Sequence, residues 1–200
     1  MNRLATAFSL ITGTRCSTCI KYLEIVGSAT TPPINLEVVT LVRDDTSQSC
    51  GRANRSVRDS LASNTGFLQI QSTAREYFYS NYLPAVLDYK NSSFERYGYP
   101  VPQNLSRGTA YPFALVSRDI SWHLPYKSTI VVPISSRLYE STAQQRKVTS
   151  AYLCIDSMAR FPFRPRHDVE LLKNVAQLLY PTVKRYTQIT SRKRRNQLAK

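Results

Sequence analysis

The sequence has 200 residues, of which 42% are hydrophobic and 20% are charged, a composition that indicates one folded domain and excludes a fibrous or wholly disordered chain. Lysine and arginine number 27 against 13 acidic residues, so the net charge of +14 favours an anionic small molecule or a polyanion as a partner. No run of about 18 apolar residues and no secretory leader pattern occurs. We therefore expect a cytoplasmic protein that makes no membrane contact.

The first 43 residues predict a helix followed by two strands. Residues 1–12 place three apolar side chains at helical spacing, and Gly13 follows where a helix commonly ends. Residues 17–26 and 35–43 are rich in apolar and β-branched residues, with turn chemistry between them. We expect these two strands to form a hairpin with a longer connection.

A polar stretch, residues 46–65, carries three arginines at three-residue steps: Arg52, Arg55 and Arg58. In a helix, side chains at this spacing share one face. The three arginines are therefore a candidate anion-binding site, with a solvated surface as the alternative that the same pattern allows.

Residues 77–99 hold six of the 13 tyrosines of the chain, and neither a strand period nor a helix period continues through them. An irregular aromatic segment of this kind is either a wall over a site or a satellite hydrophobic cluster. Tyrosine suits both, because its ring buries while its hydroxyl reaches a polar partner.

The second half of the chain predicts two strands and a long closing helix. Residues 127–134 form a β-branched run that ends at Pro133, and residues 147–156 predict its hairpin partner. Residues 166–190 repeat apolar side chains along one helix face, and we expect Pro181 to kink this helix near its middle.

Five positive charges lie close to the end of the sequence: Arg192, Lys193, Arg194, Arg195 and Lys200. We therefore divide the chain into one domain, residues 1–190, and a basic tail, residues 191–200. The tail is interpreted as a solvated extension of the helix or as an arm that contacts a polyanion.

Three stretches resemble the GAF domain family. Residues 126–134, Tyr-Lys-Ser-Thr-Ile-Val-Val-Pro-Ile, are similar to the GAF strand that ends in a hydrophobic-Pro-hydrophobic turn. Residues 148–156 resemble the strand that follows it, and residues 161–186 resemble the closing segment, with Asp-Val-Glu-Leu-Leu at the start of its helix. Shorter matches at residues 63–67 and 89–91 extend the resemblance to a stand-alone bacterial-type GAF domain over nearly the whole chain.

The resemblance implies an α+β fold: an antiparallel sheet of five or six strands, with the N- and C-terminal helices on one face and the irregular aromatic-rich segment on the other. Members of this family bind small molecules on the second face, often cyclic nucleotides, tetrapyrroles or metabolites. The expected ligand-binding residues are those of the short matches and of the first strand motif: Asn64, Phe67, Tyr89, Asn91, Tyr126 and Ser128. Their expected roles are hydrogen bonding, stacking and forming the pocket edge.

The four cysteines predict neither a disulfide framework nor a metal site. Cys16 and Cys19 have zinc-like spacing, but a second pair of ligands is missing, and on a strand the two side chains would point to opposite faces. Some single-domain GAF proteins reduce free methionine sulfoxide with a cysteine nucleophile. For that chemistry Cys50, in the polar stretch, is the better candidate, because Cys154 lies inside an apolar strand.

Together these observations predict a small-molecule-sensing regulatory domain without its own output domain. Its ligand is expected to be anionic or aromatic, its cofactor is not identified, and it acts through a protein partner or as a homodimer through the terminal helices. A GAF-type free methionine sulfoxide reductase and a basic nucleic-acid-binding or partner-binding module stay open as alternatives. The charge suits a nucleic acid, but no helix-turn-helix, zinc finger or aromatic RNA-binding strand motif occurs.

Overall fold

The computed structural model describes residues 1–26, 35–45, 58–73, 75–99, 116, 119–137 and 147–198. Its centre is one antiparallel six-stranded sheet in the order β3-β2-β1-β6-β5-β4. The strands are β1 (Cys16–Val26), β2 (Asn35–Arg43), β3 (Arg58–Ser60), β4 (Phe78–Ser80), β5 (Ser128–Arg137) and β6 (Lys147–Ser157). The two predicted hairpins, β1–β2 and β5–β6, are confirmed, and β1 pairs with β6 to join them.

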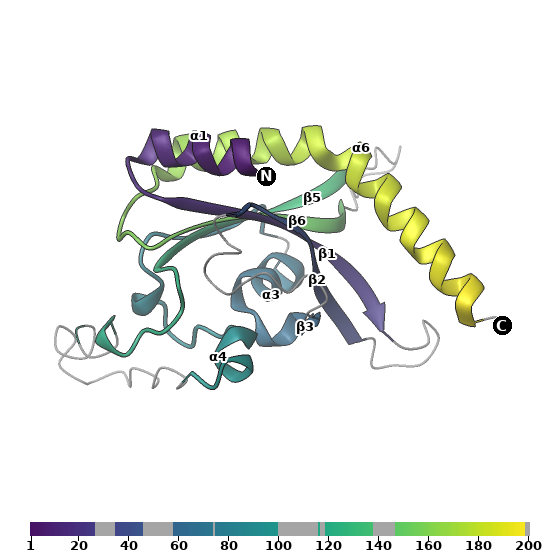
Figure 1. Ribbon diagram of the computed structural model, residues 1–200, viewed down its shortest axis with the longest axis horizontal. Coiled ribbons are helices and arrows are strands. Elements are labelled where there is room, and N and C mark those ends of the chain that lie inside the picture. Colours follow the sequence, from purple (N-terminus) through teal and green to yellow (C-terminus); the bar gives the residue numbers. More distant parts are fainter. Residues whose placement is uncertain are drawn as a thin grey trace.

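Helices cover both faces of this sheet (Figure 1). The terminal helices α1 (Asn2–Thr12) and α6 (Pro165–Leu198) lie side by side on one face, as expected. The opposite face carries α3 (Thr65–Ser72), α4 (Ser92–Arg96) and two short 3-10 turns, η2 (Leu61–Ser63) and η3 (Leu83–Ala85). The fold is therefore a three-layered α+β arrangement.

Strand alternation divides the apolar side chains between two cores. On β5, Ile130, Val132 and Ile134 are fully buried against the side of α1 and α6, where Phe8 and Leu172 join them. Val131, between them in sequence, belongs to the second core on the opposite face. Each fully buried aliphatic side chain contributes about 1.5–3 kcal/mol, so the sheet is held from both sides.

The strand predicted to end at Pro133 continues to Arg137. Proline lacks a backbone N–H and is tolerated where a strand has a neighbour on one side. At Pro133 that condition holds in the described part of the chain, because β4 pairs with β5 only over Thr129–Val131 while Pro133 lies opposite Tyr152 of β6.

The segment described as irregular contains more regular structure than its sequence predicts. Residues 77–99 include the edge strand β4, the 3-10 turn η3 and the one-turn helix α4. The three residues of β4 are too few to show the alternation of apolar and polar residues that marks a strand. This segment is a strand because it pairs with β5 in the folded chain.

The closing helix α6 is longer than expected, and it changes direction along its length where Figure 1 passes from light green to yellow. Pro181 lies inside this helix. Proline removes one intrahelical hydrogen bond and commonly causes such a bend. None of the helices in the described ranges is both long and apolar enough to cross a membrane.

Candidate functional site

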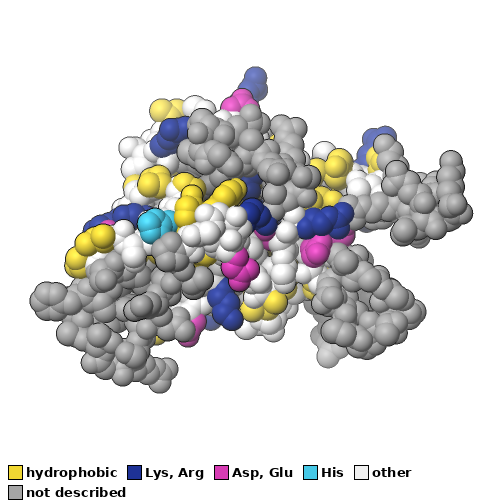
Figure 2. Space-filling view, turned by 60° about the horizontal axis from the view of Figure 1, so that its bottom comes forward, with side chains coloured by type: hydrophobic (Ala, Val, Ile, Leu, Met, Phe, Trp, Pro, Cys, Tyr) yellow, Lys and Arg dark blue, Asp and Glu magenta, His cyan; other side chains and the backbone are white. Residues whose placement is uncertain are grey.

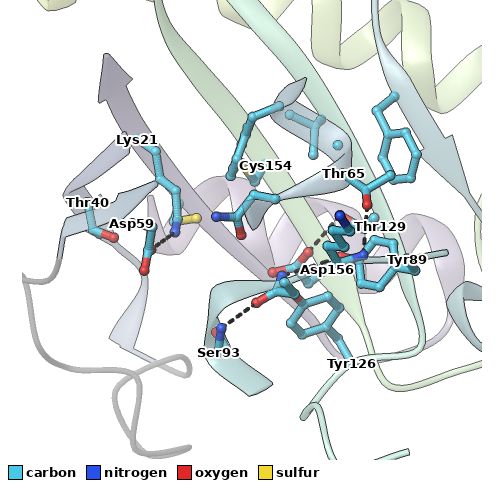
Figure 3. A pocket seen from close by; sticks show the side chains of 18 of the residues that line it. Lys21, Thr40, Asp59, Thr65, Tyr89, Ser93, Tyr126, Thr129, Cys154 and Asp156 are labelled. Carbon is cyan, nitrogen blue, oxygen red and sulfur yellow. Dashed lines mark hydrogen bonds and ion pairs between the residues drawn. The ribbon is translucent and has the colours of Figure 1, made fainter. Parts of the chain in front are cut away.

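A cavity of about 220 Å³ lies on the sheet face opposite α1 and α6. Its floor comes from β1, β2, β4, β5 and β6, and its walls come from α3, α4 and the segments around Tyr89 and Tyr126. The lining side chains that carry charge or sulfur are Cys19, Lys21, Arg43, Asp59, Lys90, Arg96, Cys154 and Asp156. In Figure 3, Lys21, Thr40 and Asp59 lie on one side of the cavity, and Tyr89 and Tyr126 on the other.

One row of directly opposed residues crosses five strands along the cavity floor. From β2 to β4 the row reads Arg43, Cys19, Cys154, Val131 and Phe78. All five line the cavity. Directly opposed residues project from the same face of an antiparallel sheet, with Cβ atoms about 4.5–5.5 Å apart. The floor therefore changes from cationic through two thiols to apolar.

A β-bulge brings Arg43 and Thr40 to the same face. The register between β1 and β2 shifts between Ile20 and Lys21, so that Lys21 lies opposite Thr40 while Cys19 lies opposite Arg43. Residues three positions apart on a regular strand point to opposite faces. The extra residue in the bulge removes this restriction, and both polar side chains reach the cavity.

Arg43 has a donor without an acceptor among the described residues. One of its terminal nitrogens donates to Thr40 Oγ1 at 3.4 Å. Its Nε is buried and has no hydrogen-bond partner in the part of the chain that the structure describes. A buried donor without an acceptor costs about 1–3 kcal/mol, so this position favours a ligand that brings one.

Asp59 is held by three donors at the cavity edge. Lys21 Nζ lies 3.0 Å from Asp59 Oδ2, Ser92 Oγ donates to Oδ1 at 2.8 Å, and Arg96 also pairs with Oδ1. Burial raises the pKa of this carboxyl, but Lys21, Arg96 and Ser92 together hold it below its ordinary value. Asp59 is therefore an anion that positions two cations of the cavity.

The environment shifts the pKa values of the two floor thiols in opposite directions. The hydrogen bond from Cys154 lowers the pKa of Cys19, against the effect of burial, and the charges of Arg43 and Lys21 add to the lowering. The same hydrogen bond and burial raise the pKa of Cys154 well above its ordinary value. Of the two thiols, Cys19 therefore loses its proton more readily than Cys154.

Aromatic rings form the wall above the floor. The ring centroids of Phe67 and Tyr152 lie 4.8 Å apart. The Lys21 ammonium lies 5.6 Å from the centroid of the Phe67 ring. Tyr89 packs between Phe78 and Trp122. Burial raises the pKa of Tyr89 to about 12, even though hydrogen bonds with Asn91 and Tyr126 act in the opposite direction. Phe67 and Tyr89, which the sequence predicted as ligand-binding residues, both line the cavity, and each packs against other aromatic rings.

Asn64 and Asn91 also line the cavity, with their amides bonded inside the chain. Asn64 donates to the Ser60 carbonyl at 2.8 Å. Asn91 donates to the Tyr126 hydroxyl at 2.7 Å, and its Oδ1 caps α4 by accepting from the Ser93 N–H at 2.9 Å. These two residues position the wall. Tyr126 also lines the cavity, and its hydrogen bond with Asn91 holds its hydroxyl in place.

Ser128 does not line this cavity, in contrast to the prediction from the sequence. Its hydroxyl donates to the carbonyls of Ser157 and Ala159, at 3.2 and 3.0 Å, and the residue is fully buried. Ser128 is separated by two positions from Ile130, which faces α6, so strand alternation directs it away from the cavity. Its neighbour Thr129 lines the cavity instead and donates to Asp156 Oδ1 at 2.7 Å.

The predicted arginine face is also not found in the described residues. Arg58 lies on the edge strand β3, where it pairs with Glu24 and Glu37 and does not line the cavity. A strand conformation removes the helical spacing on which the prediction rested. Arg52, Arg55 and Cys50 lie outside the described residues.

Sequence reasoning missed the polar floor of the cavity. A signal for part of it was present: Cys19 and Lys21, and likewise Cys154 and Asp156, are spaced two apart in segments predicted to be strands. Side chains at this spacing share a face, so four of the floor residues could have been grouped in pairs. Thr40 and Arg43 carry no such signal, because the bulge that unites them appears only in the pairing register.

The described residues contain no group of three or more metal-ligating side chains. Cys16 and Cys19 indeed face opposite sides of the sheet, since Cys16 belongs to the core beneath α1 and Cys19 to the core of the cavity side.

The surface around α3 and α4 carries basic and acidic side chains interspersed with apolar ones (Figure 2). On the described part of this face, no broad band of a single charge sign is visible.

Comparisons with known proteins bear on the fold. No protein-family model and no curated protein matches the chain. One similar solved structure is a far-red cyanobacteriochrome photoreceptor, with a TM-score of 0.50 and 10% sequence identity over 92% of this chain and 84% of that chain. Another is a type II free methionine-R-sulfoxide reductase from Thermoplasma acidophilum, with a TM-score of 0.49 and 13% identity over 92% of this chain and 89% of that chain. At such identities the similarity concerns the fold alone, and the expected GAF-like α+β fold is confirmed.

Proposed function

We propose that this chain is a GAF-family sensory domain whose cavity binds a small oxyanion, a carboxylate or phosphate group, attached to an apolar or aromatic body. The observation that carries the proposal is Arg43, whose buried Nε lacks an acceptor at the cavity floor. Guanidinium groups bind carboxylates and phosphates through two parallel hydrogen bonds. The ligand would supply the acceptor that the described residues do not.

The rest of the lining supports an amphipathic ligand. Four cationic side chains, Lys21, Arg43, Lys90 and Arg96, face two anionic ones, Asp59 and Asp156. The aromatic rings of Phe67 and Tyr89 add an apolar surface to the same cavity. A volume of about 220 Å³ is smaller than the roughly 300–1,000 Å³ of typical drug-sized sites. We therefore expect a compact metabolite.

The experiment is a thermal-unfolding titration with inorganic phosphate as the probe, in chloride buffers of matched ionic strength. A ligand present at one hundred times its dissociation constant stabilises the fold by about 2.7 kcal/mol. Arg43→Gln should fold and lose the response. Arg58→Gln is the matched control, because Arg58 lies outside the cavity lining and pairs with Glu24 and Glu37 on the sheet edge. Equal responses of the two variants and the parent would contradict the proposal.

The proposed output passes through the terminal helices. They cover the sheet face opposite the cavity, and they carry exposed leucines such as Leu10 and Leu178. Apolar side chains exposed on a helix suit contact with a second helix. Sedimentation of the parent and of Leu178→Glu, with and without phosphate, tests whether ligand binding changes a self-association made by this helix.

A second candidate, the methionine sulfoxide reductase considered from the sequence, gains one supporting observation. Two thiols, Cys19 and Cys154, line the cavity. The test is turnover of free methionine sulfoxide with dithiothreitol as reductant. Turnover that disappears in Cys19→Ser would make the chain an enzyme and would replace the sensory proposal.

A further inference from the structure

We propose that Cys19 and Cys154 are a redox-active dithiol that closes to a disulfide on the cavity floor when the protein meets a peroxide. This inference rests on the geometry of the floor and is independent of the ligand proposed above.

The two residues are directly opposed on neighbouring antiparallel strands, β1 and β6. Direct opposition places the Cα atoms of an antiparallel pair about 4.5 or 5.5 Å apart. Disulfides join cysteines whose Cα atoms lie about 4.4–6.8 Å apart. The Cα spacing therefore suits a disulfide, and closing the bond requires the two Cβ atoms to approach from about 4.5–5.5 Å to about 3.5–4.5 Å.

The pair is sheltered from bulk solvent but open to the cavity. Cys19 is 3% exposed and Cys154 is 4% exposed, and both line the cavity. A cavity of about 220 Å³ admits a molecule as small as hydrogen peroxide, since water occupies about 30 Å³. Proteins do not fit into a cavity of this volume, so a small oxidant is the suitable co-reactant.

The surroundings divide the chemistry between the two sulfur atoms. Arg43 lies opposite Cys19 on the other neighbouring strand, and Lys21 is two residues further along β1 on the same face. Both cations stabilise a thiolate at Cys19, while the Cys154 thiol donates a hydrogen bond to it. Cys19 is the attacking sulfur, and Cys154 is the resolving one.

The reaction has two steps. The Cys19 thiolate attacks one oxygen of hydrogen peroxide, the O–O bond breaks, and hydroxide leaves while Cys19 becomes a sulfenic acid. The Cys154 sulfur then bonds to the Cys19 sulfur, the S–O bond breaks, and the leaving hydroxyl takes the Cys154 proton as water. Two electrons pass from the dithiol to the peroxide, which ends as one hydroxide and one water.

The experiment treats the folded, reduced, full-length protein with hydrogen peroxide, removes the oxidant with catalase and blocks the remaining thiols with N-ethylmaleimide. Peptide mapping by mass spectrometry without reduction should show one linked pair, Cys19 with Cys154, and dithiothreitol should restore both thiols. Unchanged thiols at these two positions in protein that stays folded, or a linkage to Cys50 instead, would overturn the proposal.

Single variants separate the two roles. Cys154→Ser should leave Cys19 as a sulfenic acid that dimedone traps, and Cys19→Ser should leave Cys154 unmodified. Cys50→Ser and Cys16→Ala are the controls and should still form the linked pair, because Cys16 lies on the opposite face of the sheet. Equal dimedone labelling of both single serine variants would contradict the assignment of Cys19 as the attacking sulfur. The mapping of the parent needs no variant and no ligand, so it is informative even where phosphate does not bind.

Discussion

Lys21 on β1 and Asp59 on β3 are joined by an ion pair of 3.0 Å that passes over the strand between them. The side chain of Asp59 is 3% exposed and that of Lys21 is 13% exposed. The pair links the short edge strand to the centre of the sheet at the border of the cavity.

Replacing Asp59 by Asn should lower the free energy of unfolding by about 3 kcal/mol, because Lys21 and Arg96 would lose their buried counter-charge. Urea denaturation measures this loss. Arg58→Gln is a control on the adjacent residue, where the exposed ion pairs should contribute less than about 1 kcal/mol. Similar losses in both variants would show that Asp59 has no special role.

The same carboxylate predicts a pH dependence. The pKa of Asp59 is lowered in the folded state, so its bonds stabilise the fold above the ordinary carboxyl pKa of about 3.9. This stabilisation is lost as the pH falls through the lower folded-state value. The free energy of unfolding should therefore fall less steeply with acid in Asp59→Asn than in the parent, in urea titrations from about pH 5 to pH 2. Parallel curves would contradict the prediction.

Asn91 offers a test of how the cavity wall is held. Asn91→Ala removes both the cap of α4 and the hydrogen bond to Tyr126, and should cost about 1–2 kcal/mol of unfolding free energy. Asn91→Asp keeps the capping oxygen and lets the Tyr126 hydroxyl donate instead, so its stability should stay near that of the parent. Denaturation curves of the two variants decide this, and equal losses would show that the capping oxygen contributes little.

Oxidation of the proposed dithiol should strengthen anion binding in the cavity. A disulfide removes the negative charge of the Cys19 thiolate beside Arg43, so the affinity for inorganic phosphate should rise about tenfold, as for one unit charge in a partly hydrated site. Calorimetric titration of reduced and oxidised protein measures it. Cys154→Ser cannot form the disulfide. After the same peroxide treatment and catalase quench, and after dithiothreitol has reduced its sulfenic acid, this variant should show no change in its affinity for phosphate.

The basic tail should be dispensable for folding. In the part of α6 whose side chains are described, the last buried residue is Val183, well before residue 191. Deleting residues 191–200 should change the melting temperature little and lower the affinity for a polyanion such as heparin, measured by elution salt concentration. A marked fall in melting temperature would show that the tail packs on the domain.

The long elements of this fold could be predicted from the sequence. The β-branched residues of segments 127–134 and 147–156 identify two long strands, and the helical periodicity of residues 166–190 identifies the closing helix. The three-residue edge strands β3 and β4 could not be predicted, because a strand of this length has no period and forms only where a neighbour offers free hydrogen-bonding groups.

Part of the aromatic wall could be predicted from the sequence, since Phe67 and Tyr89 lie in short stretches that resemble motifs of a known family. The floor could not. Arg43, Cys19 and Cys154 are separated by up to 135 positions, from 19 to 154, and become neighbours only through the pairing of β2, β1 and β6. Strand register and the bulge near Lys21 decide which side chains meet, and both depend on hydrogen bonds between distant segments that local sequence does not specify.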